Sequence, residues 1–139
     1  MKTTLSPYLN FMGQAKAAME FYKSVLGGKL DIQTYKDAGF PHEPKDDDKV
    51  IHANLEIEGM IIMASDGNDE HPVHVGDNVH LSFMGTDEAK LKGFFDKLSE
   101  GGKIDMPLAK QFWGDTYGQF TDKFGIHWTV NISPETPTK

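Results

Sequence analysis

The chain has 139 residues, of which 14 are basic and 21 acidic, and its net charge of −7 argues against a role in nucleic-acid binding. It contains no cysteine, which excludes disulfides, thiolate metal sites and cysteine nucleophiles. No apolar run approaches the ~20 residues that cross a bilayer, and because the first residues lack a basic region followed by an apolar core, we expect neither secretion nor a membrane span. With 38% hydrophobic residues, the chain is expected to be a globular cytoplasmic protein that binds neither nucleic acid nor membrane.

The first half of the chain predicts one helix among four strands. Residues 5–11 alternate between apolar and polar side chains, as a half-buried strand does. Apolar residues then recur at helical spacing from Ala15 to Leu26, and this helix is predicted to end at Gly27 and Gly28 because glycine adopts a left-handed backbone without a Cβ clash. Three more strands are predicted over residues 29–35, 50–57 and 60–65.

The second half repeats this order. The Gly-Gly-Lys motif at residues 27–29 recurs at residues 101–103, 74 positions later, and the residues before both motifs also match. A strand over residues 79–84 precedes a helix with apolar spacing from Leu91 to Leu98. Strands are then predicted over residues 103–112, 116–121 and 126–132. The pattern indicates a duplicated β-α-β-β-β unit rather than a solenoid of many repeats.

Turn and loop residues separate these elements. Glu58 and Gly59 predict a tight turn between two strands, whereas residues 37–49, rich in proline and aspartate, predict a long loop. We expect a single domain over residues 1–139. Its first module covers about residues 1–66, a linker follows over about 67–77, and the second module covers about 78–139.

Several ordered motifs resemble one known family. They lie at residues 7–11, 20–23, 51–53, 113–115 and 122–128. With the duplicated order, they resemble the PhnB-like branch of the vicinal oxygen chelate superfamily, which includes glyoxalase I, bleomycin-resistance proteins and extradiol dioxygenases. The resemblance covers nearly the whole chain. It implies an α+β fold in which two β-α-β-β-β modules form an incompletely closed eight-stranded mixed barrel with the helices outside.

Side chains along a strand alternate between two faces, so each predicted strand has an apolar set and a polar set. In most antiparallel sheets the polar set faces solvent, but in the resembled fold the face opposite the helices lines a central cup. A cup with imidazoles, hydroxyls and amides suits a small polar molecule. The predicted ligand-binding residues are Tyr8, Asn10, His52, Glu56, His80, Trp113, Tyr117 and Thr129.

The two tryptophans have different expected roles. Trp128 alternates with the apolar set of its strand and is predicted to lie in the core. Trp113 lies at a strand end, where its ring would either close over a ligand or pack at a subunit interface. Both roles stay open on the sequence alone.

The resemblance also allows a metal site to be tested. Enzymes of this superfamily bind a divalent metal through four side chains from the first and last strands of each half. The matching positions here are Ser6 or Pro7, Met63, His80 and Thr129, of which only the histidine is a good ligand. We therefore expect no metal cofactor. An atypical divalent-metal site would have to combine His80 with residues such as His52 and Glu56.

These observations lead to two functional hypotheses. The first is a metal-independent small-molecule binding protein of the glyoxalase/bleomycin-resistance type, expected as a homodimer because the resembled proteins commonly dimerise. The alternative is a divalent-metal-dependent lyase, isomerase or dioxygenase that uses His80 with an atypical ligand set. Some members of the branch carry the label demethylubiquinone methyltransferase, but this sequence has no glycine-rich nucleotide loop for a methyl donor.

Overall fold

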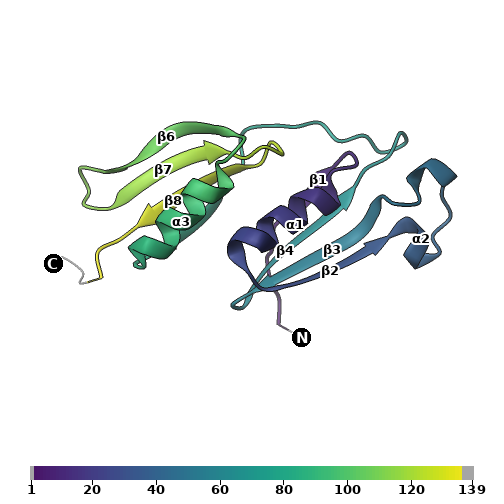
Figure 1. Ribbon diagram of the computed structural model, residues 1–139, viewed down its shortest axis with the longest axis horizontal. Coiled ribbons are helices and arrows are strands. Elements are labelled where there is room, and N and C mark those ends of the chain that lie inside the picture. Colours follow the sequence, from purple (N-terminus) through teal and green to yellow (C-terminus); the bar gives the residue numbers. More distant parts are fainter. Residues whose placement is uncertain (1, 136–139) are drawn as a thin grey trace. The chain divides into compact units, whose positions relative to one another are not determined.

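The computed structural model describes residues 2–135, which fold into two compact units that divide between His74 and Val75. Each unit consists of a four-stranded mixed sheet with a long helix across one face (Figure 1). The eight strands form two four-stranded sheets, one in each unit. The predicted α+β class and the duplication are confirmed, because both sheets have the same strand order.

The first unit carries its sheet in the order β1-β4-β3-β2. The outer strand β1 pairs in parallel with β4, and the other neighbours are antiparallel. The elements are β1 (Tyr8–Phe11), α1 (Ala15–Leu26), β2 (Lys29–Thr34), α2 (Tyr35–Ala38), the 3-10 turn η1 (Pro44–Asp46), β3 (Val50–Ile57) and β4 (Met60–Asp66).

The second unit repeats this arrangement in the order β5-β8-β7-β6. Here β5 pairs in parallel with β8, while β7 is antiparallel to both β8 and β6. The elements are β5 (Leu81–Gly85), α3 (Glu88–Leu98), β6 (Lys103–Lys110), β7 (Thr116–Thr121) and β8 (His127–Ile132).

The second glycine of each Gly-Gly pair is required by a close approach of two strands. A Cβ atom on Gly28 would lie 2.2 Å from the backbone oxygen of Glu56, and one on Gly102 would lie 2.1 Å from that of Thr121. Both distances are far below van der Waals contact. The repeated motif therefore marks the same packing requirement in both units, in addition to the left-handed turn that follows each helix.

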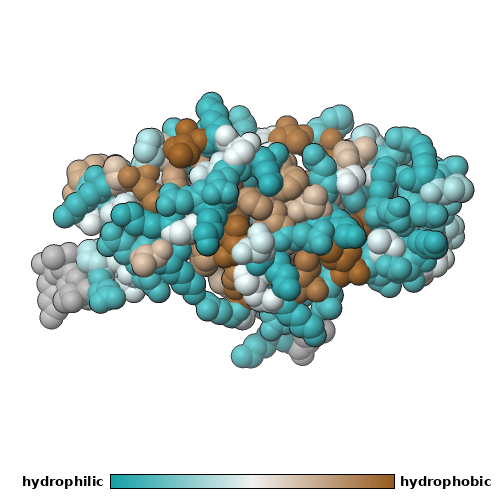
Figure 2. All heavy atoms as spheres, viewed as in Figure 1, coloured by the Kyte–Doolittle hydropathy of each residue, from teal (hydrophilic) through white to brown (hydrophobic). Residues whose placement is uncertain are grey.

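The core of each unit lies between its long helix and one face of its sheet. Helix α1 buries Ala18, Met19 and Tyr22 against the first sheet. In the second unit Trp128 is 1% exposed, as predicted, and its ring stacks on Phe83 at a centroid distance of 5.5 Å. Hydrophilic side chains dominate the visible surface, with separate apolar areas between them (Figure 2).

Two buried carboxylates fasten loops to these cores. Asp66 is 5% exposed and lies at the end of β4, although its position suggested the edge of a linker. It accepts hydrogen bonds from the backbone N–H groups of Gly13, Ala15 and Val50 at 2.8, 3.0 and 2.9 Å. In the second unit, Asp122 accepts from two backbone N–H groups and from the indole of Trp128. Both aspartates are therefore structural residues.

Several predicted element ends differ from the structure. Leu5 is fully exposed and Val79 is 71% exposed, because both precede the first paired residue of their strands. The strand predicted over residues 103–112 ends at Lys110, where the chain turns. Ser99, rather than a glycine, caps α3. The loop predicted over residues 37–49 contains η1 and part of α2, which begins with a capping box between Thr34 and Asp37.

Candidate functional site

The face of the first sheet opposite α1 carries exposed polar side chains from three strands. The Tyr8 hydroxyl lies 3.5 Å from Nδ1 of His52, at the long limit of a hydrogen bond, and the two rings are 6.0 Å apart. Beside them, Ser65 donates to the Asn10 side chain at 3.3 Å. Glu56 lies farther along β3, in register with Lys29. We call this surface the first open face.

The corresponding face of the second sheet, the second open face, is more continuously hydrogen-bonded. The backbone register aligns Ser82, Thr129 and Gln119 across β5, β8 and β7. The Thr129 hydroxyl donates to Ser82 Oγ at 2.7 Å, and the Gln119 amide donates to the Tyr117 hydroxyl at 2.9 Å. Thr129 is only 7% exposed, so this row is partly removed from solvent and preorganised by its own bonds.

A pair of histidines lies at one end of the second open face. The rings of His80 and His127 stack at a centroid distance of 5.2 Å and an interplanar angle of 20°. Nδ1 of His127 lies 2.9 Å from the Thr121 hydroxyl, which donates to Asp105 at 2.8 Å. Nε2 of His127 lies 3.1 Å from the Gly76 carbonyl oxygen. His127 is therefore held on two sides, and His80 lies against it.

Aromatic side chains occupy the opposite end of the second open face, near the β6–β7 turn. Trp113 lies edge-on to Tyr117 at 6.1 Å and to Phe112 at 5.0 Å. In the next register row, Asn131 pairs with Tyr117, and the Asn131 amide donates to Asp115 at 2.9 Å. The second open face thus runs from a histidine pair, through a row of hydroxyls and an amide, to an aromatic cluster with a carboxylate.

The structure brings together some of the residues predicted from the sequence. Tyr8 contacts His52, and Trp113 contacts Tyr117, whereas the other predicted residues are bonded to side chains outside the predicted set or stand alone on their face. The polar partners missed by the prediction are Ser65, Ser82, Asp115, Gln119, Thr121, His127 and Asn131. The alternation of Gln119 and Thr121 with the predicted Tyr117 along β7 is the sequence signal that would have found two of these missed positions.

The positions that match the superfamily's metal ligands do not fit a divalent ion here. Met63 offers a thioether, a poor ligand for a hard cation. The Thr129 hydroxyl is buried and committed to Ser82, while the His80 ring is stacked on a second imidazole. Within each unit, the described residues hold no group of three or more histidines and carboxylates that could bind a metal.

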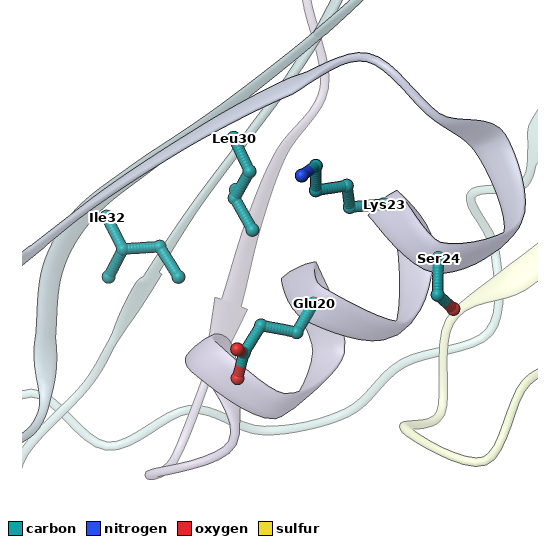
Figure 3. A pocket seen from close by; sticks show the side chains of 5 residues that line it. All are labelled: Glu20, Lys23, Ser24, Leu30 and Ile32. Carbon is teal, nitrogen blue, oxygen red and sulfur yellow. The ribbon is translucent and has the colours of Figure 1, made fainter.

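A separate hollow of about 530 Å³ lies on the helix side of the first unit (Figure 3). Leu30 and Ile32 of β2 form its apolar floor, and Glu20, Lys23 and Ser24 of α1 form its rim. None of the residues predicted to bind a ligand lines it. The hollow lies on the face of β2 that packs against α1 and is open to solvent.

Charged side chains tie the segment around η1 to the loop after β4. His42 lies between the Phe40 carbonyl oxygen and the Asp47 carboxylate, whose oxygen is 2.6 Å from Nε2. The Phe40 carbonyl and then Asp47 raise the pKa of His42, because both ring nitrogens must donate. Lys45 pairs with Asp69, which raises the pKa of the lysine and lowers that of the carboxyl. These contacts order a long connection within the first unit.

The sequence and fold of this chain are similar to those of known proteins. The Glyoxalase/Bleomycin resistance protein/Dioxygenase superfamily matches residues 5–130. The chain belongs to this superfamily. Protein YjdN of Escherichia coli is 33% identical over 97% of this chain and 99% of its own length. An uncharacterised Mycobacterium bovis protein, Mb0911c, is 30% identical over 94% of this chain and 83% of its own.

Two solved structures share the fold of this chain. Protein PA1353 of Pseudomonas aeruginosa has a TM-score of 0.85 and 32% identity, and the match covers 96% of this chain and all of the other. The PhnB protein of Bacillus cereus has a TM-score of 0.78 and 26% identity, covering 94% of this chain and all of its own. The resemblance to PhnB-like proteins is thereby confirmed. No helix among the described residues is both long and apolar enough to span a membrane.

Proposed function

We propose that this chain binds a small polar molecule on the second open face, without the four-ligand metal site of the superfamily's enzymes. The observation that carries the proposal is the row formed by Ser82, Thr129, Gln119 and Tyr117 on the second open face. Hydroxyl and amide groups can both donate and accept, so this row would recognise hydroxyl, carbonyl or amide groups of a ligand.

The packing of each sheet against its own helix supports a binding role for the open face on the other side. The alternate side chains of the same strands form the cores, so the polar sets are not needed to hold the helices. The Thr129 side chain is nevertheless only 7% exposed, and its hydroxyl donates a hydrogen bond to Ser82. A polar group at that level of burial restricts which ligand groups could replace or extend its hydrogen bond, and this restriction is a source of specificity.

The experiment is to identify what accompanies the purified protein. Native mass spectrometry would report any added mass, and denaturing extraction followed by mass spectrometry would identify the molecule. We expect a small polar compound whose occupancy falls in Gln119→Ala by the equivalent of about 1–3 kcal/mol, the value of one lost buried hydrogen bond. Thr116→Val, on the opposite face of the same strand, is the matched control and should retain the compound.

The same preparation separates this proposal from metal-dependent catalysis. Elemental analysis should find nickel, zinc, manganese and iron well below one equivalent per chain, both before and after chelation and re-addition. One equivalent of metal that disappears in His80→Ala would replace the proposal with the divalent-metal-dependent alternative. Unchanged occupancy of the co-purified compound in Gln119→Ala would instead show that the second open face is not its site.

A further inference from the structure

The β6–β7 turn carries two large aromatic side chains where turns usually carry small polar ones. The backbone N–H of Gly114 donates to the Gln111 carbonyl oxygen at 3.0 Å, which places Phe112 and Trp113 at the centre of the turn. Phe112 is 97% exposed and Trp113 is 50% exposed. Turn-centre rings this exposed add nothing to the core, and such a local departure from folding rules is expected mainly at functional sites.

These rings lie beside the carboxylate of Asp115, which can accept a further interaction. Asp115 follows the turn, and one of its carboxylate oxygens accepts from the Asn131 amide. Its other oxygen accepts no hydrogen bond, and no lysine or histidine pairs with it, among the described residues. Asn131 is the register partner of Tyr117, which in turn contacts Trp113. The carboxylate and the aromatic rings therefore belong to one corner of the second open face.

The remaining surroundings favour a positive ligand over a negative one. All 14 basic residues of the chain are lysines, so no guanidinium group is present to hold a phosphate or carboxylate with two hydrogen bonds. Lys103, on the second open face, lies 3.8 Å from Asp105 at the far end from the turn, and Lys110, next to the turn, is in register with Thr116 on the opposite face of the sheet. The aromatic corner is completed by the polarizable thioether of Met84, which is 75% exposed and in register with Asn131.

We propose that this corner, formed by Phe112, Trp113, Asp115, Tyr117 and Asn131, binds a methylated ammonium group. Aromatic faces attract such a cation through their negative quadrupoles, and a nearby carboxylate supplies the opposite charge without needing an N–H donor from the ligand. The edge-on contacts of Trp113 with Phe112 and Tyr117 leave the rings in different planes, as a cation surrounded by π-faces requires. The inference rests on the proposed function and names the ligand class for one end of the same face.

Choline is a suitable probe, because its uncharged isostere dimethylbutanol has the same shape with carbon in place of nitrogen. Ligand-observed NMR on the full chain should detect choline binding in the millimolar range, with the isostere at least about tenfold weaker. Choline should also perturb tryptophan fluorescence. That signal reports Trp113, because the other tryptophan, Trp128, is 1% exposed.

Matched variants test the residues. Trp113→Leu and Asp115→Asn should each weaken choline binding by about tenfold or more, because each removes one source of attraction for the cation. Asp105→Asn is the control for general loss of negative charge, since Asp105 lies on the same sheet but is bonded by Thr121. It should leave choline affinity within about twofold of the wild type. Phe40→Leu, in the first unit and 53% exposed, controls for the loss of an exposed aromatic ring.

Each contrary result has a distinct meaning. Equal affinity for choline and dimethylbutanol would overturn the proposal, as would an equal loss in Asp115→Asn and Asp105→Asn. No choline binding, together with a sedimentation change in Trp113→Leu, would assign the rings to a protein contact instead. If choline does not bind but the co-purified compound still depends on Gln119, the ligand class is wrong and the proposed function stands. If neither molecule depends on the second open face, both proposals fail.

Discussion

Replacing Asp66 with alanine should destabilise the first unit more than any surface substitution. Its carboxylate accepts hydrogen bonds from three backbone N–H groups, two at the start of α1 and one at the start of β3. Hydrogen bonds to a charged acceptor contribute about 1.5–3 kcal/mol each, and a lost helix cap alone costs about 1 kcal/mol. Because the contributions of hydrogen bonds that share one acceptor group are not additive, we expect a total loss of about 3 kcal/mol rather than the full sum.

Urea unfolding followed by far-UV circular dichroism measures this loss, and a chain of this length should show a melting temperature lower by about 10 °C. Asp66→Asn should lie between alanine and wild type, because its one oxygen can accept from the helix while its amide faces a donor on β3. Asp31→Ala, an exposed aspartate on β2, is the control and should stay within about 0.5 kcal/mol of wild type.

The comparison of Asp66→Ala with Asp31→Ala therefore tests the structural role of Asp66 directly. If Asp66→Ala unfolds at the same urea concentration as Asp31→Ala, the buried carboxylate does not join α1 to β3, and the structural role given to Asp66 is wrong.

Two further predictions concern backbone packing and pH. Gly102→Ala should lower the free energy of unfolding by more than about 2 kcal/mol, because its Cβ would lie 2.1 Å from a carbonyl oxygen. In α3, the Cβ of Gly93→Ala meets nothing within 4 Å, so this variant should be more stable by about 0.5–1 kcal/mol. Thermal melts in which both variants shift in the same direction would contradict this prediction. The Phe40 carbonyl and Asp47 raise the pKa of His42 in the folded chain. The stability that protonated His42 contributes to the fold is therefore fully present below the pKa of the unfolded chain, about 6.5, and is lost as the pH rises through the higher pKa of the folded chain. The urea midpoint of the wild type should fall as the pH rises through this range, and the fall should be smaller in His42→Gln. Identical pH profiles of the two proteins would refute the interaction of His42 with Phe40 and Asp47.

The sequence alone identified the family, the duplication and most of the element order. The strand at Val50–Ile57 and the helix at Ala15–Leu26 have the predicted bounds, because their apolar periodicity is a local property of the chain. The same alternation placed Trp128 in the core and placed His52 on the opposite face from Leu55. Local rules were sufficient wherever neighbouring residues along the chain decide the conformation.

Tertiary structure decided what depends on residues distant in the sequence. Asp66 looks like a loop residue until α1 and β3 bring their N–H groups to its carboxylate. The Thr129 hydroxyl acquires its direction from Ser82, 47 positions away, and the second glycine of each pair is required by a strand that passes close to it. Hydrogen bonds and steric contacts of this kind depend on distances between strands, which no local pattern of side chains contains.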